Sequence, residues 1–249
     1  MVRITDEYVI NQRRQSPNID TSHRCVFRCP QCARQKIISQ DQIRRSFDLS
    51  EENFQKILDF YNQVNFCGQI SDPIYHPSFL NLLGMCDTQQ VEASISTVGS
   101  GKSDAWWDEA YSYGIGGGYG SGLNTWIFGI DGIDKKSEIY RVGSDFKDSW
   151  NRMIQGRDLG HLVLWQYIIF GYNEHEIDRA IEIAKEEDIS LMFIATNRNF
   201  NTTSPTLRKS VKFDITKPSG KEYTSEVIKS GGWGFMSSEL NLHISKRRS

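Results

Sequence analysis

The feature that most constrains the fold is an alternation of short apolar segments with segments of helical periodicity. The expected helices follow the amphipathic spacing of apolar residues and cover residues 49–61, 77–86, 103–113, 145–154 and 174–187. The expected strands are residues 19–24, 64–67, 91–96, 125–130, 162–170 and 189–195. This alternation is typical of parallel βαβ units with right-handed crossovers. We therefore predict an α/β fold, a partial (β/α)6 TIM-like barrel with mostly parallel strands.

The same pattern divides the chain into three expected regions. Residues 1–18 form a polar N-terminal lead-in, residues 19–200 form the core barrel, and residues 201–249 form a C-terminal extension that caps the barrel and has a partly disordered end. Inside the core, Gly114–Gly122 holds six glycines in nine residues. Such a run loses much backbone entropy on ordering, and we interpret it as a flexible connector.

Composition excludes several classes of protein. The formal net charge is -2 and the pI is about 6.2, which does not indicate general binding to nucleic acid or to an anionic membrane. No apolar run is long enough to span a membrane, and the N-terminus lacks the apolar core of a signal peptide. Five cysteines are an odd number and do not suggest a secreted disulfide framework. We therefore expect a cytoplasmic protein.

Three cysteines are the strongest chemical signal. Cys25, Cys29 and Cys32 follow the first expected strand with C-x3-C-x2-C spacing. Structural zinc and the Fe–S clusters of electron carriers take four protein ligands, whereas reactive sites leave a coordination position open. Three cysteines without an obvious fourth ligand favour a metal centre that binds something from outside. On spacing alone, an iron–sulfur cluster, a zinc site and three unrelated buried thiols all stay open.

This spacing resembles the signature of the radical SAM superfamily. The resemblance implies a [4Fe-4S] cluster on Cys25, Cys29 and Cys32 whose fourth iron binds S-adenosylmethionine (SAM). Reductive cleavage of SAM would give a 5′-deoxyadenosyl radical that abstracts hydrogen from a substrate. It also implies an electron donor such as flavodoxin or ferredoxin.

Residues 66–77 resemble the second motif of that superfamily. Asp72-Pro73 and His76-Pro77 match its acidic and His-Pro halves, as in a branch from bacteria and their viruses with the pattern C-G-x-x-G-D-P-x-x-H-P. The resemblance assigns Gly68 and Asp72 to the amino group of SAM. An alternative is a turn in which Asp72 caps the next helix. We expect His76 to be structural.

Residues 96–103 (S-T-V-G-S-G-K-S) have two interpretations. They resemble the S-T-N-G segment of the same branch, including the double tryptophan that follows at Trp106-Trp107, and this makes Thr97 a candidate for SAM binding. They also nearly spell a Walker A loop with Lys102 as its lysine, except that Ser96 replaces the first glycine.

Residues 129–132 and 139–143 resemble the S-x-D-G and Y-R-x-G motifs of the branch. The resemblance makes Arg141 the candidate for the SAM carboxylate, because a guanidinium can fork onto a carboxylate. An exposed surface arginine is the alternative. Asp131 would bind the ribose hydroxyls or shape the turn. We expect Asn173 and Glu176 to cap the following helix rather than to act in chemistry.

The sequence therefore predicts a radical SAM enzyme with an unidentified substrate, a peptide or a small metabolite. No cysteine follows Cys86, so we expect a single cluster without a C-terminal auxiliary-cluster (SPASM-like) region. Cys67 and Cys86 are expected to be buried, inert thiols. Two alternatives are a zinc-stabilised α/β binding protein without catalysis and a P-loop nucleotide hydrolase.

Overall fold

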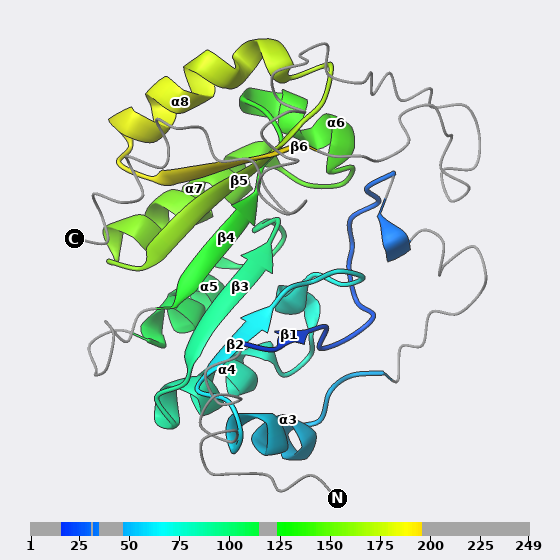
Figure 1. The fold of residues 1–249 in the computed structure, drawn as a ribbon, viewed down its shortest axis with the longest axis vertical. Coiled ribbons are helices and arrows are strands. Elements are labelled where there is room, and N and C mark those ends of the chain that lie inside the picture. Colours follow the sequence, from blue (N-terminus) through cyan, green and yellow to red (C-terminus); the bar gives the residue numbers. More distant parts are fainter. Residues whose placement is uncertain (1–15, 31, 35–46, 115–123, 196–249) are drawn as a thin grey trace, which may run out of the picture.

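A single parallel sheet forms the framework of the protein (Figure 1). The computed structural model describes residues 16–30, 32–34, 47–114 and 124–195. The strands are β1 (Asn18–Ile19), β2 (Gln63–Phe66), β3 (Glu92–Thr97), β4 (Thr125–Gly129), β5 (Leu162–Ile169) and β6 (Ser190–Ala195). They lie in sequential order and every neighbouring pair is parallel. Within the described residues β1 and β6 do not pair, so the barrel is partial, as predicted.

The helices lie between consecutive strands and cover the convex face of the sheet (Figure 1). They are α3 (Glu51–Leu58), α4 (Phe79–Thr88), α5 (Asp104–Ser112), α6 (Ser137–Tyr140), α7 (Phe146–Asp158) and α8 (Ile177–Glu186), with 3-10 turns η1 (Pro73–Tyr75), η3 (Asp134–Lys136) and η4 (Glu174–Glu176). Side chains of Ser50, Ser103 and Asp145 accept a backbone N–H at the starts of α3, α5 and α7. These caps explain why the helices begin close to the predicted positions. None of the helices in the described ranges is long and apolar enough to cross a bilayer.

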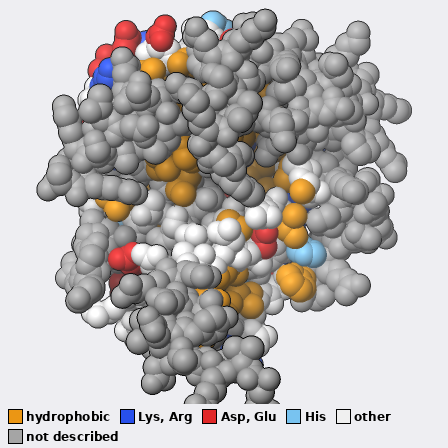
Figure 2. Space-filling model, in the orientation of Figure 1, with side chains coloured by type: hydrophobic (Ala, Val, Ile, Leu, Met, Phe, Trp, Pro, Cys, Tyr) orange, Lys and Arg blue, Asp and Glu red, His pale blue; other side chains and the backbone are white. Residues whose placement is uncertain are grey.

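The two faces of the sheet differ in burial. Side chains that point to the helices are fully buried, among them Phe66, Ile95, Trp126 and Trp165. Their neighbours on the concave face stay partly exposed: Asn65, Ser94, Ser96, Ile127, Gln166 and Met192. Figure 2 shows hydrophobic and other uncharged side chains predominating over charged ones where this face is visible. The main core therefore lies between the sheet and the helices, whereas the concave face carries partly exposed side chains among the described residues.

The first strand is shorter than predicted. β1 ends at Ile19, whereas a strand over 19–24 was expected. Beyond Ile19 the backbone bonds to loops instead: Leu49 N–H donates to Thr21 O at 2.8 Å and Asp72 N–H to Arg24 O at 3.0 Å. These loop contacts lead the chain out of the sheet and into the cysteine segment.

The expectation that Asn173 and Glu176 cap the next helix holds for their positions but not for their side chains. Asn173 is the N-cap residue of η4 and Glu176 that of α8, and neither side chain makes a cap hydrogen bond. Instead, the Asn173 amide donates to Asp131 O at 2.8 Å and to Ile168 O at 3.0 Å, and its oxygen accepts from Phe170 N–H at 2.7 Å. The side chain therefore joins the loops after β4 and β5.

Other expectations lie outside the described residues. These are the glycine-rich connector beyond Gly114, the C-terminal extension over 201–249, and the lead-in up to residue 15.

Candidate functional site

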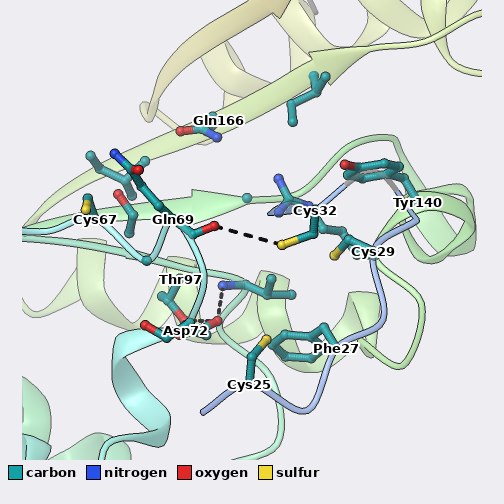
Figure 3. Close-up of a pocket in the computed structure, with 18 of the residues that line it drawn as sticks. Cys25, Phe27, Cys29, Cys32, Cys67, Gln69, Asp72, Thr97, Tyr140 and Gln166 are labelled. Atoms are coloured by element: carbon teal, nitrogen blue, oxygen red, sulfur yellow. Dashed lines mark hydrogen bonds between the residues drawn. The ribbon is translucent and has the colours of Figure 1, made fainter. Parts of the chain in front are cut away.

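A cavity of about 460 Å³ opens at the carboxyl ends of the strands (Figure 3). This size suits a small-molecule site. It is lined by most of the residues that the sequence singled out: Cys25, Cys29, Cys32, Gly68, Asp72, Thr97 and Arg141. Asp131 is not among the lining residues and is fully buried. Parallel strands bring their carboxyl ends to one edge, so segments far apart in sequence meet here.

The three cysteines come from one loop held against two others. Cys32 N–H donates to Cys29 O at 3.2 Å, which closes a turn within the loop, and Arg28 N–H donates to Val142 O at 2.8 Å. The Cys32 thiol faces Gln69 O at 3.9 Å. All three cysteines are free of disulfides, Cys29 buried and the others half-buried. They are therefore available as ligands on the wall of the cavity.

The described residues offer no ready-made site for a single metal ion. Within the described part of the chain, no three His, Cys, Asp or Glu side chains gather closely enough to hold one. Zinc needs its thiolates in one tetrahedral shell at about 2.3 Å. A four-iron cube instead bonds each thiolate to a different iron, so its ligands surround a larger body. Among the described residues the three cysteines therefore do not form a ready-made shell for one zinc ion.

The Cys25 thiol needs a strong cation to ionise. Burial raises the pKa of Cys25 far above its usual value, and the charges of Asp72 and Cys29 raise it further. A bound metal centre deprotonates a coordinating thiol outright. Without one, this thiol would stay protonated and unreactive.

Asp72 anchors the loop after β2 to the end of β3. Its carboxylate accepts hydrogen bonds from Thr97 Oγ1 at 2.8 Å, Val98 N–H at 2.9 Å and Ile74 N–H at 3.3 Å. Burial raises the pKa of Asp72 to about 6, while these donors oppose the increase. Three donors leave a carboxylate little free acceptor capacity. Asp72 therefore caps η1, as the alternative held, while still lining the cavity.

Gly68 occupies a position that other residues fit poorly. Its φ is +54°, and a Cβ there would lie 2.6 Å from Ser71 O. The next turn is fixed by Asp20, whose Oδ1 accepts from Ile70 N–H at 3.2 Å and from Ser71 Oγ at 3.0 Å. The backbone of this loop therefore lines the cavity in a conformation that Gly68 and Asp20 fix.

Arg141 is a half-buried cation clamped by a buried carboxylate. Its Nε donates to Asp131 Oδ2 at 2.6 Å, and Asp131 Oδ1 also accepts from Ile168 N–H at 2.8 Å. Burial alone would lower the pKa of Arg141, but Asp131 raises it well above the usual value. The side chain is only 15% exposed, so Arg141 is not an ordinary surface arginine.

The contacts of residues 96–103 do not form a phosphate-binding loop. Gly101 N–H donates to Asp148 Oδ2 at 2.9 Å, and Val98 N–H is taken by Asp72. Lys102 Nζ lies 5.0 Å from the ring centre of Tyr75 and 5.1 Å from that of Trp106. Carboxylates occupy the N–H groups that a Walker loop offers to phosphates, and the lysine rests on aromatic rings. The P-loop interpretation is therefore not supported.

Three further residues named in the sequence analysis, one histidine and two cysteines, lie in different surroundings. His76 is buried, with Nε2 3.1 Å from Leu49 O and Nδ1 accepting from Ser78 N–H, which is a structural arrangement. Cys86 is buried in the core, as expected. Cys67 is half-exposed and lines the cavity, contrary to expectation.

Sequence reasoning missed several residues of the cavity, chiefly Gly129, Tyr140, Gln166 and Met192. One signal was present: Gln166 is the polar residue that interrupts an otherwise apolar strand. Gly129 had no such signal, because its role depends on the approach of Arg141 from the loop beyond.

Solved structures of other proteins share this fold, although the sequence comparisons find no match. No family model matches the sequence, and no curated protein is similar to it. Solved structures do match. SuiB of Streptococcus suis bound to precursor peptide SuiA has a TM-score of 0.61 at 14% identity over 90% of this chain and 48% of that one. Native anSMEcpe with bound AdoMet and Kp18Cys peptide has a TM-score of 0.58 at 13% identity, and the match covers 86% of this chain and 61% of that one. Methylornithine synthase (PylB) has a TM-score of 0.52 at 15% identity, and the match covers 85% of this chain and 61% of that one.

These structural neighbours are radical SAM enzymes, and the chain shares their partial TIM-barrel fold. It spans about half the length of the SuiB structures that it matches. At this level of identity the likeness concerns the fold.

Proposed function

We propose that this protein is a radical SAM enzyme that carries a [4Fe-4S] cluster on Cys25, Cys29 and Cys32. The observation that carries the proposal is that these thiols line one cavity together with Arg141, at the carboxyl ends of the strands, and that buried Asp131 holds Arg141 from behind. The shared fold supports it, since SuiB and anSMEcpe have been solved with S-adenosylmethionine bound. When bound, the cluster and SAM would supply a 5′-deoxyadenosyl radical that abstracts hydrogen from the substrate.

The residues of the chain have separate roles in holding SAM. Arg141 offers the guanidinium edge that Asp131 leaves free, and this edge suits a carboxylate. Asp131 positions Arg141 and does not touch the ligand. Gly68 and its loop offer backbone carbonyls to the ammonium group. Asp72 holds that loop and the Thr97 hydroxyl in place and adds negative charge nearby.

An apolar wall limits the access of water to the cysteines. Phe27, Tyr140 and Ile168 line the cavity and belong to one buried cluster with Cys29. Exclusion of water protects reactive species and strengthens charge interactions. An external electron donor, such as a flavodoxin or ferredoxin, and a peptide or small-molecule substrate complete the proposal.

The proposal is tested by anaerobic reconstitution with iron and sulfide. We expect about four irons per chain, and 5′-deoxyadenosine on addition of SAM and dithionite. Cys25→Ala should lose both. Cys86→Ala removes a core cysteine away from the cavity and should keep both. Wild-type protein that takes up zinc in place of iron, or makes no 5′-deoxyadenosine, would contradict the proposal.

A further inference from the structure

The cavity extends from the cysteines down the concave face of the sheet. Eight of its lining residues belong to strands β3 to β6. Besides Thr97 and Gly129, they are Ser96, Ile127, Gln166, Ile168, Met192 and Ile194. We call these six residues the sheet floor. None of them carries a charge. They combine apolar surface with one hydroxyl and one carboxamide, so the floor is amphipathic and neutral.

The charged residues that line the cavity are already bonded elsewhere. Among the described lining residues these are Asp72 and Arg141. Asp72 is bound by three donors, and Arg141 is paired with Asp131. In the proposed function the free edge of Arg141 is used by SAM. No described charge is then left on the floor to neutralise a phosphate, carboxylate or ammonium group, and burying an unpaired charge is costly.

Gln166 is the group on the floor that can recognise a polar ligand. It pairs in register with Gly129 on one side and Met192 on the other, so the three share the concave face. Its carboxamide is half-buried and makes no hydrogen bond to any described residue. A carboxamide has two N–H donors and a carbonyl acceptor, the same groups that another amide requires. Figure 3 shows it across the cavity from Asp72 and Thr97.

Gly129 places this carboxamide beside the proposed SAM site. A Cβ on Gly129 would lie 2.7 Å from Arg141 Nη2, so the guanidinium lies against the neighbour of Gln166. A group held by Gln166 would therefore lie next to SAM rather than at a remote surface.

From these observations we infer that the sheet floor is the substrate subsite and takes an uncharged amide with an apolar substituent, as in a peptide segment. Gln166 is its specificity-determining residue. This inference rests on the proposed function, because SAM must occupy Arg141. It excludes phosphorylated metabolites and free amino acids as the part of the substrate that reaches the floor.

The test compares two probes that share a side chain. N-acetyl-leucinamide is neutral with two amides, whereas leucine carries both charges. Each is titrated into the anaerobic, SAM-loaded enzyme and followed by saturation-transfer NMR. We expect N-acetyl-leucinamide to bind at least about tenfold more tightly than leucine, the equivalent of about 1.4 kcal/mol. Equal or tighter binding of leucine, or binding of neither probe, overturns the inference.

Variants assign the effect to Gln166. Methionine has a length similar to that of glutamine but no amide, so Gln166→Met should lower the affinity for N-acetyl-leucinamide about tenfold. Gln166→Ala should show the same loss. Gln89→Leu replaces an exposed glutamine beyond the end of α4 and should change nothing. Unchanged probe affinity in both Gln166 variants, or a loss of SAM affinity instead, overturns the role given to Gln166.

The same samples separate the two proposals. Formation of 5′-deoxyadenosine by the wild type reports on the proposed function alone. If it forms but the probes are not discriminated, only the inference about the floor fails. If it does not form, the proposed function fails regardless of the probes.

Discussion

Single residues at this site act by holding other residues. Asp131 accepts a hydrogen bond from Arg141 and does not line the cavity. The Asp72 carboxylate accepts hydrogen bonds from Thr97, Val98 and Ile74. Both carboxylates were candidates for direct contact with SAM. The structure places one behind a guanidinium and the other inside a turn, because a buried carboxylate is stable only with donors around it.

Gly129 offers a sharp test at this scale. We expect Gly129→Ala to displace the Arg141 guanidinium, since the new Cβ would lie 2.7 Å from Nη2. Loss of a charge-assisted hydrogen bond costs about 1.5–3 kcal/mol, so SAM affinity should fall by roughly tenfold to a hundredfold. Calorimetric titration of the reconstituted protein with SAM measures this.

Two comparisons make that result specific. Arg141→Lys keeps the positive charge but loses the planar, two-pronged guanidinium, so it should also lower the affinity for SAM. Heat unfolding of Gly129→Ala measures how far the displaced guanidinium also loosens its pair with buried Asp131. An unchanged SAM affinity in Gly129→Ala would show that Arg141 does not hold SAM.

At the scale of elements, the site depends on loops that tie strand ends together. The loops after β4 and β5 are joined through Asn173, and those after β2 and β3 through Asp72. The cysteine loop is bound to the segment after α6 by Arg28 N–H and Val142 O. Each of these loops is therefore held by contacts with a neighbouring loop as well as by its own turn contacts.

Removal of the Asn173 side chain should loosen two loops at once. Asn173→Ala deletes three hydrogen bonds and leaves the Phe170 N–H buried without that acceptor. We expect a loss of about 2–4 kcal/mol in the free energy of unfolding. Urea unfolding measures it, with Asn62→Ala, an exposed asparagine, expected to stay within about 0.5 kcal/mol. A cost for Asn173→Ala no larger than for Asn62→Ala would refute the linking role.

At the scale of the whole molecule, one face of the open sheet packs against the main core, and the other face lines the cavity. The convex face and the helices bury the large aromatic residues, while the concave face keeps partly exposed side chains. Ligands on the concave face can therefore change without disturbing the main core. Their binding should still stabilise the fold, because they bind the native state and not the unfolded chain.

Cluster removal tests this coupling. The reconstituted protein should unfold at a higher temperature than the same protein stripped of iron, by about 5 °C or more for a stabilisation of about 2–3 kcal/mol. Scanning calorimetry under anaerobic conditions gives both midpoints. In Cys25→Ala the reconstitution step should leave the midpoint unchanged. Equal midpoints for loaded and stripped wild type would mean that the cysteines do not hold the cluster in the native fold.

The sequence by itself determined the order of strands and helices and the loop that carries the three cysteines. Hydrophobic periodicity and capping residues act over a few neighbours, so patterns such as Ser103 before α5 can be interpreted locally. The parallel order of the strands also brings the segments that follow them to one edge of the sheet. Only the tertiary structure decided what each side chain contacts there. Whether Asp131 reaches a ligand, whether Asn173 caps a helix, and whether Gly129 seats Arg141 all depend on contacts between segments distant in sequence, and such contacts leave no local pattern.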